Sequence, residues 1–310
     1  MVKRVLITGA GGFIGRACLA PLAERGYEIH GVTRSAVVSS PETRWHSVDL
    51  LDTEAVDALV AEVRPTHLLH LAWVTEPGRY QRSAENFRWV RASLALLEGF
   101  ARNGGERCVG AGSCAEYDSR LGVCSERTTA LAPTSPYGVC KHALQLMLRS
   151  FSEFTGISSA WGRVFSLYGP HEHPQRLVPS LARAILAGEE APCTVGDQVR
   201  DYLHVEDVAA AFVALVDSAA SGSFNIASGD GVPVRELARM IGEACGRPDL
   251  VRLGGLPARP DDPAELVGDA SRLHAETGWK PRWGLCEGIE STVRWWAEAR
   301  GTQERSVPCD

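Results

Sequence analysis

The sequence has no long hydrophobic run and no basic run, and these two absences exclude whole classes of protein. Although 45% of the 310 residues are apolar, no stretch approaches the roughly 20 consecutive apolar residues that a membrane span needs. The net charge is −6, and no cluster of basic residues resembles a nucleic-acid groove. Lysine is scarce and occurs only at Lys3, Lys141 and Lys280. We therefore expect a soluble protein with no membrane or nucleic-acid partner.

The cysteines lack any recognisable spacing. Nine are scattered along the chain without C-x-x-C pairs or metal-ligand spacing, which indicates free thiols in a reducing compartment and no metal site. Residues 1–7 run directly into glycine-rich sequence without a small-residue cleavage site, so we expect no signal peptide. Both features predict a cytoplasmic location.

What the first half does contain is an alternation of short apolar runs and helical patterns. This alternation predicts an α/β fold with a doubly wound parallel (Rossmann) sheet. We expect a dinucleotide-binding domain over residues 1–166 and a smaller mixed α/β C-terminal lobe over 167–310, of which approximately 198–227 returns to the main sheet. The predicted strands are 5–7, 27–33, 45–48, 67–71, 107–111 and 158–165, and the predicted helices are 13–25, 56–63, 83–103 and one after Pro136.

A glycine-rich turn, Thr8-Gly9-Ala10-Gly11-Gly12-Phe13-Ile14-Gly15, joins the first strand to the first helix. In a dinucleotide-binding loop, Gly9 would allow the tight turn, Gly12 the approach of a pyrophosphate, and Gly15 close packing of helix on strand. The phosphates would sit at the helix N-terminus, where N–H groups are free. A turn without a ligand is the alternative, but the strand–turn–helix context favours a dinucleotide. The expected cofactor contacts here are Gly9, Gly12, Phe13, Ile14 and Gly15.

The end of the second strand bears on which dinucleotide binds. An NAD site usually places Asp or Glu there for the ribose 2′-OH, whereas an NADP site offers Arg to the 2′-phosphate. This strand ends Val32-Thr33-Arg34-Ser35, without an acid. Arg34, followed by Ser35, could pair with the phosphate, and no carboxylate would be there to repel it; a surface arginine in a loop is the alternative. The pattern favours NADP(H), with NAD(H) as the alternative.

Tyr137 and Lys141 are four residues apart in the helix expected after Pro136, so their side chains share one helix face. This arrangement suits proton transfer to a carbonyl oxygen. A nearby ammonium stabilises a phenolate and lowers the tyrosine pKa from about 10 toward working pH. A surface Tyr/Lys pair without a chemical role is the structural alternative.

Together, the glycine loop and the Tyr137-x-x-x-Lys141 pair resemble the extended short-chain dehydrogenases/reductases, the NAD-dependent epimerase/dehydratase family. The resemblance covers nearly the whole chain. It implies that Ser113, in Gly112-Ser113-Cys114-Ala115-Glu116-Tyr117, is the family's catalytic Ser/Thr. It also implies that Lys141 binds the nicotinamide ribose. The further cofactor contacts that it implies are Asp49, Leu50, Leu71, Ala72, Tyr137, Lys141 and Val164.

Later segments resemble the family's nucleotide-sugar-binding segments. The run at 200–207 is similar to the family's R-D-(Y/F)-x-H-V-x-D, whose Arg binds the substrate pyrophosphate, and 259–262 and 269–281 match its C-terminal signatures. Simple ion pairs or loop charges are the alternatives, but two arginines in an irregular lobe fit a diphosphate better. The resemblance implies a dTDP-, CDP-, GDP- or UDP-linked sugar. The expected substrate contacts are Trp73, Ser113, Ser166, Arg176, Arg200 and Arg259.

The residues after Ser113 narrow the reaction. The family's 4,6-dehydratases resemble one another in placing Asp and Glu, or at least Glu, directly after the Ser/Thr, but this chain has Cys114 and Ala115, with Glu116 one residue later. Without a positioned acid and base, water elimination has no proton shuttle, which disfavours a dehydratase. NADPH usually serves reduction. We therefore favour NADPH-dependent reduction of a nucleoside-diphosphate 4-keto-6-deoxysugar, with Tyr137 donating the proton, over a nucleotide-sugar 4-epimerase with bound NAD(P).

Two hypotheses from other classes stay open. A non-enzymatic NADP-sensing protein is disfavoured because both Tyr137 and Lys141 are present. An enzyme acting on a non-nucleotide ketone, such as a terpenoid or flavonoid, would give Arg200 and Arg259 no role.

Some positions depart from the family pattern. Asn is common where Ser166 and Trp89 stand, and the indole of Trp73 would suit either a sugar ring or packing. The resemblance also implies a homodimer, formed by the helices at 83–103 and 136–156. Apolar residues interpreted as lying beyond the core-facing stripe, and so compatible with this interface, are Leu144, Met147, Leu148 and Phe151.

Overall fold

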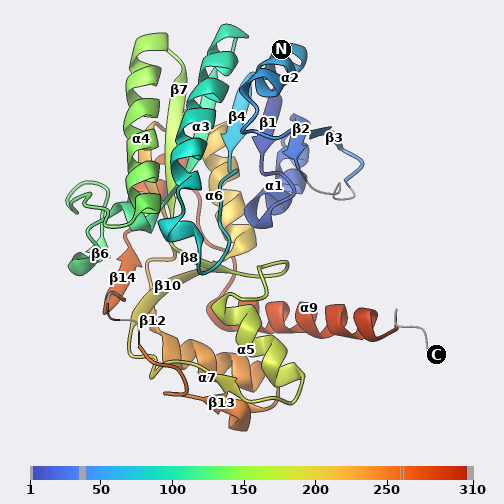
Figure 1. Cartoon of the computed structure of the whole chain (residues 1–310), viewed down its shortest axis with the longest axis vertical. Coiled ribbons are helices and arrows are strands. Elements are labelled where there is room, and N and C mark those ends of the chain that lie inside the picture. The colour runs from blue at the N-terminus through green and yellow to red at the C-terminus, as the bar shows by residue number, and fades with distance from the viewer. Residues whose placement is uncertain (1–2, 35–39, 259, 261, 306–310) are drawn as a thin grey trace.

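The computed structural model describes residues 3–34, 40–258, 260 and 262–305, and it is built on a seven-stranded parallel sheet (Figure 1). The strand order is β11-β7-β5-β4-β1-β2-β3. This confirms the predicted doubly wound parallel sheet. The bounds of its strands are β1 Arg4–Thr8, β2 Glu28–Thr33, β3 Thr43–Ser47, β4 His67–His70, β5 Arg107–Ser113, β7 Ser158–Val164 and β11 Gly222–Ile226.

Helices cover both faces of this sheet. Helices α1 (Phe13–Glu24) and α6 (Val205–Asp217) pack together on one face, and α2 (Thr53–Val63), α3 (Glu85–Arg102) and α4 (Pro136–Thr155) cover the other. Strands that are buried on both faces are apolar throughout rather than alternating. The central strand β1 shows this, because its residues 5–7 are fully buried.

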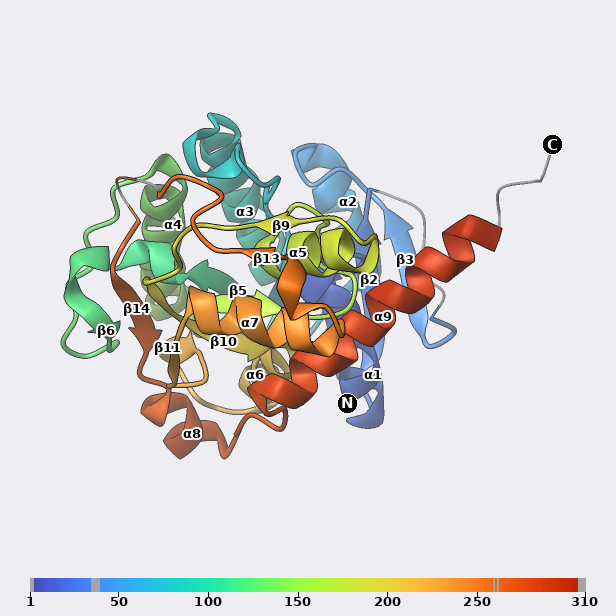
Figure 2. The same ribbon diagram turned by 90° about the horizontal axis from the view of Figure 1, so that it is seen from below.

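A second group of elements lies below the carboxyl edge of the main sheet (Figures 1 and 2). We call it the small lobe: a second sheet of order β12-β10-β14-β6, with β8 beside β10, and the helices α5, α7 and α9, which pack on one another. Its bounds, with the flanking short elements, are β6 Gly122–Cys124, β8 Ser166–Tyr168, α5 Leu177–Leu186, β9 Ala191–Pro192, β10 Val199–His204, β12 Gly231–Pro233, α7 Val234–Ala244, β13 Val251–Arg252, β14 Glu265–Gly268, α8 Ser271–Thr277 and α9 Leu285–Arg305.

The chain crosses between the two groups more than once. After β10 in the second sheet, α6 returns to the face of the main sheet, and β11 pairs with β7 at its edge. The proposed division into domains after residue 166 stays a prediction.

Helix α4 corrects part of the expected dimer interface. Leu144 and Leu148 are 1% and 4% exposed, because their four-residue spacing places them in the stripe that packs on the main sheet. Met147 is 43% exposed, and Phe151 is half-buried against the same core. The assignment of Leu144 and Leu148 to an interface was therefore wrong. The homodimer itself stays a prediction.

Two further observations concern the described part of the chain. None of its helices is long and apolar enough to cross a membrane. Its cysteines are free thiols, as expected, and most of them are buried.

Candidate active site

The site is located by the strand ends. Strands β1, β4, β5 and β7 are neighbours in the main sheet and end at Thr8, His70, Ser113 and Val164. Ligands of open parallel sheets bind outside the carboxyl ends of the strands. Figure 1 shows these ends pointing toward the small lobe. The candidate site therefore lies at this edge of the sheet.

The glycine loop after β1 leaves room for a pyrophosphate. Gly9 has a φ of +71°, and a Cβ there would lie 3.0 Å from the backbone nitrogen of Ala72. A Cβ on Gly15 would overlap the carbonyl oxygen of Gly9, so α1 packs directly on the loop. Helix α1 begins at Phe13 and Ile14 with no side-chain cap and no acidic residue in its first turn. Its first N–H groups are thus left for an anionic ligand, which fits a dinucleotide.

The residues expected around the adenosine follow β2 and β3 at the same edge. Arg34 is exposed directly after β2. Asp49 is exposed, and its Oδ1 accepts a hydrogen bond from the Leu51 backbone nitrogen at 3.1 Å, while Leu50 is buried. Ser35 lies outside the described residues.

A buried hydrogen-bonded chain fixes the segment after β4. The Thr8 hydroxyl lies 2.7 Å from His70 Nδ1, and His70 Nε2 lies 2.8 Å from the Ser93 hydroxyl. The Ala72 backbone nitrogen donates to the same Thr8 oxygen at 3.3 Å. Burial, aided by the Lys141 ammonium, lowers the pKa of His70 to about 3, so the imidazole is neutral. These bonds hold Leu71 and Ala72 beside the glycine loop.

The structure brings Ser113, Tyr137 and Lys141 together. Helix α4 is capped by Ser135, whose hydroxyl accepts from the Gly138 nitrogen at 3.1 Å, and Tyr137 and Lys141 follow in its first two turns. The Ser113 side chain lies close enough to Tyr137 to oppose the rise in the pKa of the phenol. Lys141 is 4% exposed, and its Nζ donates to the carbonyl oxygen of Ala111 at 2.8 Å.

Burial is the main cause of the pKa shifts of Lys141 and Tyr137. It lowers the pKa of Lys141 to about 7, and Glu116 partly opposes the shift. Burial and the neighbouring Tyr80 raise the pKa of Tyr137, and the Ser113 side chain opposes that rise. We expected the ammonium to lower the pKa of Tyr137; in this structure burial of the phenol raises it instead.

Glu116 is turned away from the reacting groups. It is fully buried, and its Oε1 accepts from the backbone nitrogen of Ser113 at 2.8 Å and from Nε1 of Trp161 at 2.9 Å. Its Oε2 accepts from Nε of the buried Arg163 at 2.8 Å. The carboxylate is thus neutralised and satisfied beneath the site.

The segment between β4 and α3 contacts the Tyr/Lys pair. The face of the Trp73 ring lies 3.9 Å from Lys141 Nζ, so that face is covered by the ammonium. The ring of Tyr80 meets the ring of Tyr137 edge-on, with centroids 4.8 Å apart. Sequence reasoning missed Tyr80, because it lies in a polar stretch, residues 78–82, that carries no motif.

The predicted substrate-binding residues differ in their burial and in their hydrogen-bond partners. Arg176 donates to the Thr75 carbonyl oxygen at 3.3 Å and lies over the Tyr80 ring, near the reacting groups. Arg200 is buried, and its Nη2 donates to Asp262 Oδ1 at 2.6 Å and to the Pro263 carbonyl oxygen at 2.7 Å. Ser166 begins β8 and is half-buried, and Trp89 is buried in the core. Arg259 lies outside the described residues.

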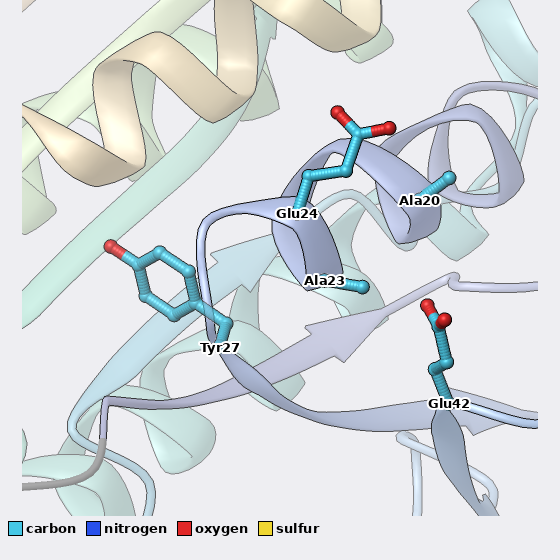
Figure 3. Close-up of a pocket in the computed structure, with 5 residues that line it drawn as sticks. All are labelled: Ala20, Ala23, Glu24, Tyr27 and Glu42. Carbon is cyan, nitrogen blue, oxygen red and sulfur yellow. The ribbon is translucent and has the colours of Figure 1, made fainter.

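A hollow of about 420 Å³ lies elsewhere, between α1 and the edge strands (Figure 3). Glu24 ends α1, and Tyr27 and Glu42 precede β2 and β3, so the hollow is at the amino edge of the sheet. Two carboxylates beside it suit a dinucleotide poorly. We therefore assign no ligand to it.

Comparison with known proteins decides the family. The family model described as "NAD dependent epimerase/dehydratase family" matches residues 5–227. The chain belongs to this family. The resemblance stated from the motifs is therefore confirmed, and the protein is an enzyme of the NAD-dependent epimerase or oxidoreductase type.

The relatives extend over almost the whole chain. A UDP-glucose 4-epimerase from Rhizobium leguminosarum bv. trifolii is 27% identical over 96% of this chain and 98% of its own. A dTDP-glucose 4,6-dehydratase from Streptomyces niveus is 27% identical over 97% and 95%. The structure of a Thermus thermophilus UDP-glucose 4-epimerase in complex with NAD is 29% identical and covers 96% of this chain and 99% of its own, with a TM-score of 0.84.

The first prediction concerns the phenol. Tyr137→Phe should lower kcat by about 100-fold or more, because it removes the group that transfers the proton, and it should leave dinucleotide binding unchanged. Turnover assays and calorimetry of cofactor binding measure the two effects. Tyr27→Phe, whose hydroxyl pairs with Asp217 at the far edge of the sheet, is the control and should retain activity. Full activity of Tyr137→Phe would contradict the assignment.

The second prediction concerns the buried pair. Glu116→Gln should lower the free energy of unfolding by about 3–5 kcal/mol, because the Arg163 charge is left buried without a counter-charge. Urea denaturation measures this change. Tyr117→Phe removes a hydroxyl that donates to Asn225 and accepts from Arg163 Nη1, but it keeps the ion pair, and it should cost less, about 2 kcal/mol. Equal losses in the two variants would show that the ion pair is not needed.

Proposed function

We propose that this protein is a nucleotide-sugar 4-epimerase that oxidises and re-reduces C4 of a nucleoside-diphosphate hexose. The observation that carries the proposal is the meeting of Ser113, Tyr137 and Lys141 beside the glycine loop, with Glu116 turned away. The names of the relatives add support, since several are UDP-glucose 4-epimerases. They favour this alternative over the 4-ketoreductase that we expected from Arg34.

Each residue has a role at the sugar. Tyr137, as phenolate, takes the proton from the C4 hydroxyl and later returns it to the C4 oxygen. The Ser113 hydroxyl donates a hydrogen bond to that oxygen as charge develops on it. Lys141, when charged, stabilises the phenolate. A dinucleotide held at its pyrophosphate by the glycine loop would supply the hydride acceptor and donor through its nicotinamide. Inversion then requires the 4-keto sugar to present its other face between the two transfers.

The site has no acid/base pair for water elimination. Glu116 already accepts three hydrogen bonds inside the protein. Burial, together with the nearby Cys124, raises the pKa of Cys114 to about 12, so this thiol is neutral and cannot act as a base near pH 7. Ala115 carries no functional group. These observations support an epimerase rather than a dehydratase.

The substrate diphosphate is assigned to Arg176 and Arg200. Arg176 joins the small lobe to the segment that holds Tyr80, next to Tyr137. Arg200 is paired with Asp262, so a diphosphate would have to displace this carboxylate or bind the same guanidinium beside it. Relatives act on UDP- and dTDP-sugars, which supports a nucleotide sugar of this kind.

The cofactor assignment is NADP(H). Arg34 directly follows β2, and Thr33 rather than an acid ends the strand. Structures of relatives contain NAD, so the preference rests on this arginine. It also supports the second candidate function, reduction of a 4-keto-6-deoxysugar by exchangeable NADPH.

The third prediction follows from this assignment. Arg34→Ala should weaken binding of NADPH by about 10-fold or more, because charge-assisted hydrogen bonds to the 2′-phosphate are lost, and leave binding of NADH unchanged. Titration of nicotinamide fluorescence measures both affinities. The control Arg44→Ala removes an exposed cation paired with Glu28 on the neighbouring strand. Equal weakening of NADPH and NADH by Arg34→Ala would contradict the NADP assignment.

The fourth prediction separates the two reactions. Purified protein is incubated with nucleoside-diphosphate hexoses or 4-keto-6-deoxysugars and with NADPH or NADH, while nicotinamide absorbance and sugar isomers are followed. Isomer formation without net nicotinamide consumption is expected. Stoichiometric NADPH consumption with a 4-keto sugar would identify the reductase instead. If only non-nucleotide ketones react and free nucleoside diphosphate does not compete, both nucleotide-sugar functions are wrong.

A further inference from the structure

The Lys141 ammonium has an unusual neighbour, the indole of Trp73. Its Nζ lies 3.9 Å from the centroid of the Trp73 ring, whereas the rings of Tyr137 and Trp161 are each 6.0 Å away. The same nitrogen donates a hydrogen bond to the Ala111 carbonyl oxygen. A cation over a tryptophan face is attracted by the ring, most strongly where water is excluded, as it is here.

The indole itself is held in place. Nε1 of Trp73 donates to Asn86 Oδ1 at 2.8 Å. Asn86 is fully buried, and its amide nitrogen donates to the carbonyl oxygens of Tyr80 at 2.7 Å and Ser83 at 2.8 Å. Rotation of the indole would leave buried polar groups without partners, which is costly. The ring therefore presents a fixed face to the ammonium.

The other charged and titratable groups around Lys141 do not replace this contact. On α4, Tyr137 is a buried phenol; on β4, His70 is neutral; and Glu116, in the turn after β5, is paired with Arg163. Since the pKa of Lys141 is about 7, a small loss of stabilisation changes its charge near neutral pH.

We propose that Trp73 is a positioning residue that holds the Lys141 ammonium, in its charged form, beside Tyr137. This inference rests on the proposed function and adds a residue to its machinery that acts only through Lys141. It also gives Trp73 a role other than the sugar contact expected from the sequence.

The fifth prediction is a change in the pH profile. The reaction needs the charged lysine, so its rate falls on the alkaline side as Lys141 loses its proton. Trp73→Leu removes the aromatic face and lowers the pKa of Lys141, so the alkaline limb should move to a pH about 1 lower. Trp73→Phe keeps a weaker aromatic face and should give a smaller displacement. A merely structural role would lower the rate without moving this limb.

The contact is also tested without substrate. With ¹⁵N-labelled indoles, the signal missing from Trp73→Phe identifies Trp73 among the eight tryptophans. That signal should shift with pH as Lys141 titrates, and Lys141→Gln should abolish the shift. Trp89→Phe is the matched control, because its ring contacts Trp73, with centroids 6.0 Å apart, and the titration should persist.

The outcomes separate the inference from the function. Two results would overturn the inference. One is a Trp73 signal whose pH dependence is absent or is the same in Lys141→Gln. The other is an alkaline limb of the pH profile that is unchanged in both Trp73 variants. If Trp73→Leu fails to fold, the pH profile of Trp73→Phe and the titration of the Trp73 signal in the native protein still test the inference. A titrating Trp73 signal in a protein that turns over no nucleotide sugar would support the contact and overturn the proposed function.

Discussion

A buried ammonium is the constraint around which the site is organised. Taking a charge out of water is expensive unless the protein replaces the lost hydration. Lys141 meets this requirement with the Ala111 carbonyl oxygen and the Trp73 ring, and it still has a depressed pKa. Stable burial therefore needs the end of β5, the first turns of α4 and the segment after β4 in one arrangement. The same arrangement places Tyr137 at the carboxyl edge of the sheet.

A second buried cation, Arg163, is stabilised in a different way. Arg163 on β7 is paired with Glu116, which also binds the backbone of Ser113. The ion pair thus connects β7 to the turn that follows β5 and fixes the backbone at Ser113. Because both carboxylate oxygens of Glu116 are engaged in these bonds, proton transfer in the proposed mechanism falls to Tyr137.

The sequence predicted what depends on local pattern. Buried strands, the glycine loop and the four-residue spacing of Tyr137 and Lys141 are all encoded within a few consecutive residues, and the structure has them in place. Contacts between distant segments have no such pattern. The Arg200–Asp262 pair joins segments 62 residues apart, and the Trp73–Asn86 hydrogen bond forms across the irregular connection between β4 and α3, where no regular spacing reveals it. Leu144 and Leu148 were misplaced because an apolar helix residue does not show by itself which neighbour covers it.

The cofactor and the reaction are more independent than the sequence argument assumed. Arg34 was taken to favour reduction because cells keep NADPH reduced, but that reasoning applies only to a cofactor that exchanges with the cellular pool. An epimerase returns its hydride in every turnover, so the redox state of the pool does not affect it. An arginine at the end of β2 is therefore compatible with both reactions. How fast the cofactor leaves, rather than which dinucleotide binds, is the property that distinguishes them.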